Sequence, residues 1–435
     1  MVRACEELGI EAVCGASTAD LAAGYPYLER AAEVVCLGPG PAAESYLAME
    51  RLIQAAKQTR CSALHPGWGF LAENARFASL CAQHGVDFIG PAPGVMDRMG
   101  RKVASRKAAH AAGLPIVPGS IGLIANAHEA VKVAEEIGYP VALKADAGGG
   151  GRGIRRCENA EEVRVAFADA SREAAAAFGD ASLYLEKYLE GGRHIEFQIF
   201  GDGHGQAIHL GERECSIQRR HQKLLEEAGS PALDAEARAH YGALSAQAAG
   251  HWNYAGAGTM EYLRAEDGQL YFLEMNTRLQ VEHPVTEQIS GLDLAQWQFR
   301  IAAGQGLPLK QSEVRWYGHA VEVRINAEDP ENDFRPAPGT LERFEVSGDG
   351  IRVDTHLAPG AKIPPHYDSL IAKVIATGET REQAIERMQS ALDSAKIEGV
   401  PTTVPLHREI LAHEDFRAAR CDTLWLGRER DAGRL

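Results

Sequence analysis

"EMNTRLQVEHPVTE", residues 274–287, places a polar side chain at every second position of its first half. The odd-numbered positions between them are mostly apolar, and this alternation has the period of a half-buried β-strand. One face of such a strand would pack on a core. The other would carry two acids, two amides and an arginine: Glu274, Asn276, Arg278, Gln280 and Glu282. A solvated strand face is also polar, so the surrounding sequence must decide whether this face is chemically active.

A predicted hairpin brings a second acid opposite the first one. The Asp-Gly pair at 267–268 is a strong two-residue turn signal between two strand-like runs. With that turn, Glu266 opposes Gln269, and counting outward places Glu261 opposite Glu274. Like charges ~5 Å apart across a strand pair destabilise it by up to about 1 kcal/mol, and a divalent cation would reverse that effect.

Asn276 extends this acidic pair along the same strand face, ~7 Å beyond Glu274. Two carboxylates and an amide oxygen are hard donors, which suit Mg²⁺ or Mn²⁺ better than Zn²⁺. We therefore expect Glu261, Glu274 and Asn276 to hold metal ions. The alternative is a solvated acidic pair without a ligand.

A glycine loop, "KADAGGGGRG" at 144–153, follows a predicted strand that ends at Lys144. Four consecutive glycines cost backbone entropy, and their use is close approach of N–H groups to phosphate oxygens. The loop is neither a P-loop nor the dinucleotide-binding motif. A flexible linker is the alternative, but Lys144, with Lys102 upstream, favours a nucleotide triphosphate.

The run "ERECSIQRRHQKLLEEAG", 212–229, concentrates basic residues in an acidic protein. It carries Arg213, Arg219, Arg220, His221 and Lys223, interleaved with Gln218 and Gln222. A solvated basic face is the usual meaning of such a run. The net charge of −15 makes a local anion site the favoured interpretation here.

Length and composition restrict the class of protein. A chain of 435 residues predicts two or three domains, and 45% hydrophobic with 24% charged residues is typical of a globular protein. No apolar run reaches the ~20 residues of a membrane span, and the N-terminus does not have the pattern of a signal peptide. Eight scattered cysteines indicate reduced thiols in a cytoplasmic protein. The negative net charge argues against nucleic-acid binding.

The order of expected elements favours α/β and α+β architecture. Strand-like runs at 32–38 and 86–91 alternate with amphipathic helices at 45–58 and 73–85, which is the βαβ pattern of a parallel sheet. A Pro/Gly-rich loop at 64–74, between these two helices, is expected at a strand end. A small unit then carries a helix over 126–138, capped by Asn126 and ended by Gly138, before strands at 139–146 and 183–189. Long hairpins start near 191, and an α+β region starts near 305.

Together these segments resemble the ATP-grasp enzymes and, within them, the biotin carboxylases. The resemblance extends over essentially the whole chain, and the most specific motifs are "RLQVEHPVTE" and "QRRHQK". It implies an ATP-grasp fold with an N-terminal parallel-sheet domain over 1–100, truncated so that its first strand is missing. An ATP-grasp region over 101–303 follows, with a lid at about 116–190, and then a C-terminal antiparallel-sheet domain over 304–435.

The resemblance also implies roles for individual residues. ATP would be bound by Lys102, Lys144, Gly150, Gly151, Glu186, Lys187, Tyr188, Leu189, His194, Gln218, His221, Glu261 and Glu274. Two Mg²⁺ or Mn²⁺ ions would be held by Glu261, Glu274 and Asn276. Bicarbonate would be bound by Lys223, Arg278, Gln280 and the Val281 backbone. Glu282 would deprotonate it, and Arg324 would bind biotin and stabilise its enolate-like oxygen.

The implied reaction is ATP-dependent carboxylation of biotin with bicarbonate, through carboxyphosphate. The sequence has no Met-Lys-Met biotinylation site, so biotin would be carried by a separate biotin carboxyl carrier protein. That arrangement favours the acetyl-CoA carboxylase of fatty acid synthesis, with carboxyltransferase subunits as further partners and a homodimer as the assembly. A component of another acyl-CoA or pyruvate carboxylase is the alternative within this family.

Two rival functions have different chemistry. Another ATP-grasp ligase that forms an acyl-phosphate, such as a carbamoyl-phosphate-type enzyme, would hydrolyse ATP without any effect of biotin. A non-catalytic nucleotide-binding or scaffold protein would bind ATP without turnover. The presence of Glu261, Glu274, Arg278, Glu282 and Arg324 together argues against the second rival.

Overall fold

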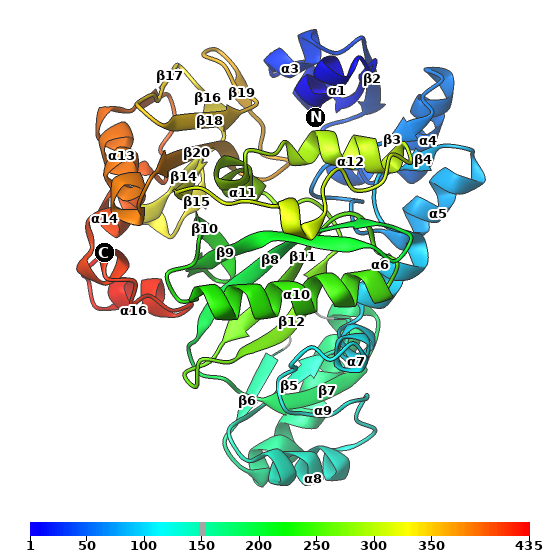
Figure 1. Cartoon of the computed structure of the whole chain (residues 1–435), viewed down its shortest axis with the longest axis vertical. Coiled ribbons are helices and arrows are strands. Elements are labelled where there is room, and N and C mark those ends of the chain that lie inside the picture. Colours follow the sequence, from blue (N-terminus) through cyan, green and yellow to red (C-terminus); the bar gives the residue numbers. More distant parts are fainter. Residues whose placement is uncertain (148–153) are drawn as a thin grey trace.

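The protein is built around one antiparallel sheet of eight strands (Figure 1). The structure is a computed structural model that describes residues 1–147 and 154–435. The strand order is β12 (Leu270–Asn276), β11 (Ala255–Arg264), β8 (Arg193–Asp202), β9 (Ala207–Arg219), β10 (Gln222–Ala228), β13 (His319–Asn326), β20 (Leu370–Gly378) and β18 (Ile351–Thr355). Hairpins join β8 to β9, β9 to β10 and β11 to β12, so the long hairpins predicted to start near residue 191 are confirmed.

The two faces of the central strands have different chemistry, because side chains alternate along a strand. On β8, Ile195 and Phe197 belong to the hydrophobic core, together with helices α6 (Pro93–Gly100), α7 (Lys102–Ala111) and α10 (Ala235–His251). Figure 1 shows α10 lying across β8, β9 and β11. The intervening residues His194 and Glu196 project from the other face, which is therefore charged although it is also buried.

The turn between β9 and β10 has only two residues, Arg220 and His221, since Arg219 pairs with Gln222. Both residues have positive φ, 49° and 66°, as a two-residue turn of this hand requires. Arg and His adopt such angles at a cost, and residues held this way concentrate at functional sites. His221 lines the cavity described below.

A small unit projects from the sheet at the bottom of Figure 1, and we call it the lid. Its sheet has the order β6 (Ile154–Cys157), β5 (Val141–Ala145) and β7 (Leu183–Lys187), packed on α8 (Ala127–Ile137) and α9 (Ala160–Phe178). The predicted caps of α8 are confirmed. The Asn126 side chain accepts a hydrogen bond from the Glu129 N–H, and Gly138 ends the helix with φ 78°.

The N-terminal region contains parallel strands, as predicted, but in two separate pairs. One pair is β1 (Val13–Ser17) with β2 (Glu33–Gly38), and the other is β3 (Ala63–Leu64) with β4 (Asp87–Phe88). Within the described residues no hydrogen bond joins the two pairs into one sheet. The helices of this region are α1 (Val2–Leu8), α2 (Thr18–Leu21), α3 (Pro26–Glu29), α4 (Met49–Gln58) and α5 (Ala75–Gln83).

The C-terminal region completes the central sheet with β13, β20 and β18. Its core joins these strands to α13 (Arg381–Ser394), α14 (Val404–Ala412), α15 (Glu414–Arg417) and α16 (Trp425–Asp431). The short pairs β14–β15 (Glu328–Asp329, Arg335–Pro336), β16–β19 (Gly339–Thr340, Lys362–Ile363) and β17–β21 (Arg343–Glu345, Lys396–Glu398) surround it. No helix among the described residues is both long enough and apolar enough to span a bilayer.

The strand predicted over 274–282 is wrong beyond Asn276, where β12 ends. The chain leaves the sheet because the Thr277 N–H donates to the Glu73 carboxylate (2.7 Å) rather than to a neighbouring strand. It then enters α11 (His283–Ser290), which has Pro284 in its first turn. Helix α12 (Leu294–Ala302) follows.

Candidate active site

A cavity of about 540 Å³ lies between the lid and the charged face of the sheet. Most of the residues predicted to bind ligands line it: Lys102, Lys144, Glu186, Lys187, Tyr188, Leu189, His194, Gln218, His221, Lys223, Glu261, Glu274, Asn276, Arg278, Gln280, Val281 and Arg324. Glu282 is fully buried beneath them. Gly150 and Gly151 lie outside the described residues. The tertiary structure thus gathers segments that are more than 200 residues apart in the sequence.

Glu261 and Glu274 oppose each other across β11 and β12, as the hairpin count predicted. The count itself was wrong at two places that cancel. The turn is longer than two residues, so Arg264 rather than Ala265 pairs with Leu270, and a bulge beside Glu261 restores the register. Asn276 donates from Nδ2 to Glu261 Oε1 (2.7 Å).

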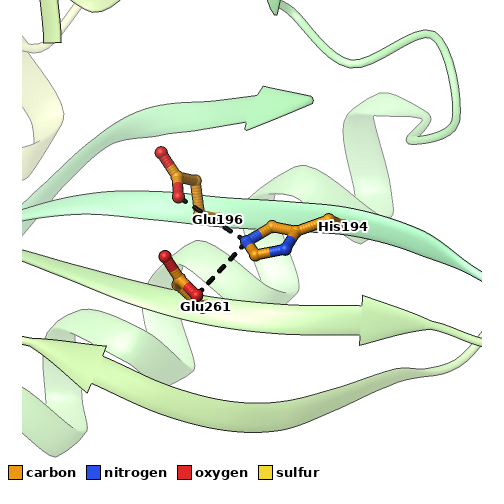
Figure 2. Close-up of side chains that lie close together, drawn as sticks. All are labelled: His194, Glu196 and Glu261. Carbon is orange, nitrogen blue, oxygen red and sulfur yellow. Dashed lines mark ion pairs between the residues drawn. The ribbon is translucent and has the colours of Figure 1, made fainter. Parts of the chain in front are cut away.

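His194 lines the cavity. It lies between two acids, Glu196 and Glu261 (Figure 2). Its Nε2 is 3.4 Å from Glu261 Oε2 and 3.8 Å from Glu196 Oε2, and its Nδ1 is 3.1 Å from Gln218 Nε2. Burial alone lowers a histidine pKa, but the two carboxylates outweigh it and raise the pKa of His194 to about 9. At neutral pH the imidazole is therefore a cation, which suits contact with phosphate oxygens.

Lys223 is the centre of the charged floor. Its ammonium lies 2.5 Å from Glu196, 3.0 Å from Glu261 and 2.7 Å from Glu282. Burial opposes its charge, but these three carboxylates raise the pKa of Lys223 well above its usual value. Glu196 is held on its other side by the fully buried Arg213 (2.6 Å).

The acids on β11 and β12 fit a hard divalent cation. Glu261, Glu274 and Asn276 line one edge of the cavity, and their carboxylate and amide oxygens are the hard donors that such a cation prefers. In this structure Lys102 (2.7 Å from Glu274) and Lys223 balance their charge. The group His194, Glu196 and Glu261 also brings three ligand atoms together, but Lys223 already pairs with two of its acids.

The segment after β12 provides groups suited to a small anion. Arg278 is held by Glu73 (2.9 Å), which leaves part of its guanidinium facing the cavity. Gln280 is 5% exposed, and its Nε2 donor finds no hydrogen-bond partner among the described residues. A buried unpaired donor costs ~1–3 kcal/mol, so a hydrogen bond from this amide to a bound anion would be favourable. Lys373 fixes the segment by donating to the Val281 carbonyl (2.6 Å).

Glu282 lies between two cations, Lys223 and Arg324. Burial raises a carboxyl pKa, but Lys223 and Arg324 outweigh burial and keep the pKa of Glu282 below its usual value. Glu282 is therefore ionised, the state in which it accepts a proton. Arg324 is itself held by two carboxylates, Glu226 (2.6 Å) and Glu282 (2.8 Å).

The lid contributes a second ion-pair group at the opposite wall. Glu186 binds Lys144 (2.5 Å) and the buried Arg106 (2.7 Å), so it joins the lid to α7. Lys187 does not point its ammonium into the cavity: it donates to the backbone carbonyls of Gly138 (3.2 Å) and Tyr139 (2.6 Å). The predicted contact of Lys187 with the nucleotide can therefore be made only by its backbone.

Four residues that hold the site together were not predicted: Glu73, Glu196, Glu226 and Lys373. Glu196 had a readable signal, since it is two residues from His194 on a predicted strand and shares its face. The other three meet their partners through pairings between distant segments, which single-sequence patterns do not reveal.

The fold and the site define the chain as an ATP-grasp enzyme, a class of ligase. Family models match three consecutive ranges: the N-terminal domain of biotin carboxylase (1–96), the ATP-binding domain of the carbamoyl-phosphate synthase L chain (101–310) and the C-terminal domain of biotin carboxylase (322–428).

Curated relatives and solved structures agree with these matches. The chain is 50% identical to biotin carboxylase of Nostoc sp. over 97% of its length and 94% of the relative's, and 49% identical to biotin carboxylase 1 of Bacillus subtilis over 98% and 95%. The biotin carboxylase domain dimer of 2-oxoglutarate carboxylase from Hydrogenobacter thermophilus, solved with MgADP, ADP and bicarbonate, matches with TM-score 0.92 and 48% identity, covering 99% of this chain and 94% of that one.

A biotin carboxylase complex from Campylobacter jejuni matches with TM-score 0.94 and 42% identity, covering 98% of this chain and 95% of that one. The chain belongs to the biotin carboxylase family.

Proposed function

We propose that the protein uses ATP and bicarbonate to carboxylate biotin held on a carrier protein. The observation that carries this proposal is the sequence of groups along one edge of the cavity: the acids Glu261 and Glu274, then Arg278 and Gln280, then the buried carboxylate Glu282 beside Arg324. In that order, these groups would hold the metal ions, bind bicarbonate, accept its proton and contact biotin.

The cations of the site would bind the nucleotide phosphates. Lys102, Lys144 and His194 face the cavity from three different elements, and the pKa of His194 keeps it charged. Attack on the γ-phosphate accumulates negative charge, which fixed cations in a buried site offset. Glu261, Glu274 and Asn276 would hold Mg²⁺ or Mn²⁺, which would offset the negative charge of the nucleotide phosphates.

Bicarbonate would bind between Lys223, Arg278, Gln280 and the Val281 backbone. Bicarbonate is a poor nucleophile until it loses its proton, and Glu282 is placed and ionised to accept it. The activated anion attacks ATP to give carboxyphosphate and ADP. Carboxyphosphate would decompose to CO₂ and phosphate, the phosphate would take the ureido proton of biotin, and Arg324 would stabilise the resulting negative oxygen. The deprotonated ureido nitrogen would then attack the carbon of CO₂ to give carboxybiotin.

Water must be kept away from carboxyphosphate, and the lid is the element suited to that task. We propose that the chain has three functional domains. They are an N-terminal domain over 1–100, an ATP-grasp region over 101–303 with its lid at about 116–190, and a C-terminal domain over 304–435. The central sheet crosses residue 303, and so places Arg324 beside the floor of the second region.

We further propose a biotin carboxyl carrier protein and carboxyltransferase subunits as partners, in an acetyl-CoA carboxylase of the cytoplasm, and a homodimer as the assembly. The eight free thiols fit a reducing compartment. Relatives include the small subunit of a 2-oxoglutarate carboxylase and part of a pyruvate carboxylase, so another acceptor is the second candidate. Pull-down of the chain with each candidate carboxyltransferase distinguishes the acceptors.

The direct test of the reaction is ATP hydrolysis by the purified chain with bicarbonate, with and without free biotin. We expect hydrolysis to require bicarbonate and to rise when biotin is added. Bicarbonate-dependent hydrolysis that ignores biotin would favour a carbamoyl-phosphate-type ligase. Nucleotide binding with no turnover would favour a scaffold protein.

A further inference from the structure

Two fully buried glutamates lie beside Arg324 on the same face of the sheet and do not line the cavity. Glu226 on β10 and Glu322 on β13 are both 0% exposed and are direct partners across the two strands. Side chains of direct partners are ~5 Å apart at Cβ and project to the same face. The β13 partner of the pair, Glu322, is two residues before Arg324 and therefore shares its face as well.

The hydrogen bonds of this pair are incomplete. Glu226 uses Oε1 to accept from Arg324 Nε (2.6 Å), and its Oε2 has no partner in the described part of the chain. Neither oxygen of Glu322 has one there. An ionised carboxylate buried without hydrogen bonds costs several kcal/mol, so such a group retains its proton.

A protonated Glu322 would pair two of these three oxygens. Its hydroxyl can donate, and Oε2 of Glu226, on the residue directly opposite, can accept. The charged groups around Glu322 agree with this state. Burial is the largest effect and raises its pKa well above normal; Lys373 and Arg324 lower it, while Glu226 and Glu282 raise it further. Lys373 on β20 donates instead to the Val281 carbonyl.

We propose that Glu226 and Glu322 share one proton and that this acid pair positions Arg324 for its contact with biotin. The shared proton fixes the Glu226 carboxylate, which in turn orients the guanidinium toward Glu282 and the cavity. Neither glutamate lines the cavity, so both are positioning residues rather than catalytic ones. The inference rests on the proposed function, because it takes Arg324 to be the group that meets biotin.

The same substitution, Glu to Gln, should have different effects at the two positions. Glu226→Gln removes the anion that holds Arg324, and we expect the biotin-dependent rate to fall about tenfold to a hundredfold. Bicarbonate-dependent ATP hydrolysis without biotin, and the KM for ATP, should stay within about threefold. Glu322→Gln replaces a protonated acid by an amide that also donates, so its rate should stay near the wild type. Glu322→Leu removes the donor and should lose about tenfold.

The matched control is Glu227→Gln. Glu227 is the next residue on β10, projects to the opposite face and pairs with Arg381 (2.6 Å) and His319 (2.9 Å), away from the cavity. It loses a buried ion pair of similar type, so it reports the effect of local destabilisation alone. We expect no selective loss of the biotin-dependent rate in this variant once folding is confirmed by circular dichroism.

An infrared measurement tests the proton itself. The difference spectrum between the wild type and Glu322→Gln at neutral pH should contain the C=O band of a protonated carboxylic acid. Absence of that band, a Glu322→Gln variant as impaired as Glu322→Leu, or a Glu226→Gln variant with a normal biotin-dependent rate would overturn the inference. A wild-type protein without any biotin-dependent turnover would instead overturn the proposed function.

Discussion

The floor of the cavity and the solvent-exposed surface of the lid both carry ion pairs, but the pairs differ in their exposure to water. On the floor, the side chains of Lys223, Glu196 and Glu282 are 11%, 0% and 0% exposed. On the lid, every side chain in the pairs Arg155–Glu173, Arg164–Glu161 and Arg172–Asp169 is at least 47% exposed. Buried pairs are poorly screened, and removal of one partner is costly because it leaves the other charge buried, whereas exposed pairs contribute little.

This contrast separates two tasks. The floor holds charges fixed before the substrates arrive, so no reorganisation is needed when charge develops. The lid is stabilised by its own apolar core. It is joined to α7 through the Arg106–Glu186 pair and through Asp146, which accepts a hydrogen bond from the Val103 N–H (2.7 Å). A unit with its own core and few fixed attachments suits closure over a substrate.

Removal of Lys223, the central cation, should destabilise the protein and abolish activity. Lys223→Met leaves Glu196 and Glu282 buried beside an uncharged side chain, and the loss of one partner of a buried pair costs about 3–5 kcal/mol. We expect that loss in the free energy of unfolding by urea denaturation, together with loss of bicarbonate-dependent ATP hydrolysis. Arg220→Ala is the control, because its exposed pair with Asp333 should be worth less than about 1 kcal/mol. Equal effects of the two substitutions would contradict the distinction.

Substitution of the proposed base should abolish chemistry while the fold survives. Glu282→Gln keeps the size of the side chain but cannot accept the proton of bicarbonate, so the rate should fall about 10²–10⁴-fold. Steady-state hydrolysis with saturating ATP measures this, and nucleotide binding by fluorescence should be nearly unchanged. A variant that retains the wild-type rate would remove Glu282 from the mechanism.

A buried pair on the opposite face of β10 should give the sheet an acid-sensitive stability. Burial raises the pKa of Glu227, but His319 and Arg381 outweigh burial and lower it to about 2 from 4.5. A lowered pKa stabilises the folded state above pH 4.5 and loses that contribution as the pH falls toward 2. Glu227→Gln should therefore cost on the order of 3 kcal/mol near neutral pH and flatten this acid limb. Parallel stability curves for both proteins would argue against the pair.

Removal of an exposed ion pair on the lid should hardly change the free energy of unfolding. Arg172→Ala removes a pair with Asp169 whose side chains are 79% and 51% exposed, so the free energy of unfolding should change by less than about 0.5 kcal/mol. Thermal denaturation at low and high salt checks this. A change above about 1 kcal/mol would show that lid charges act as floor charges do.

The sequence predicted the groups of the site better than the backbone that presents them. Glu261 and Glu274 face each other as expected, but only because a longer turn and a bulge offset one another. Alternation over 274–282 indicated a strand, yet the chain leaves the sheet at Asn276 to meet Glu73. Polar periodicity reports which residues share an environment and does not report where a ladder of hydrogen bonds ends.

The partners that fix the site were less predictable than the groups that face it. Glu226 meets Arg324, and Lys373 meets Val281, across pairings of β10, β13, β20 and the segment before α11. Such pairings depend on the order of strands in the sheet, which local propensity does not encode. The resemblance to a known family suggested roles for residues, and the structure revealed the partners that hold those residues in position.

Transfer of labelled carbon from bicarbonate to biotin tests the central claim most directly. Incubation of the chain with ATP, Mg²⁺, labelled bicarbonate and free biotin should give labelled carboxybiotin, and Glu282→Gln should give none above background. ATP hydrolysis that proceeds at the same rate in both proteins, with no label in biotin, would contradict the account.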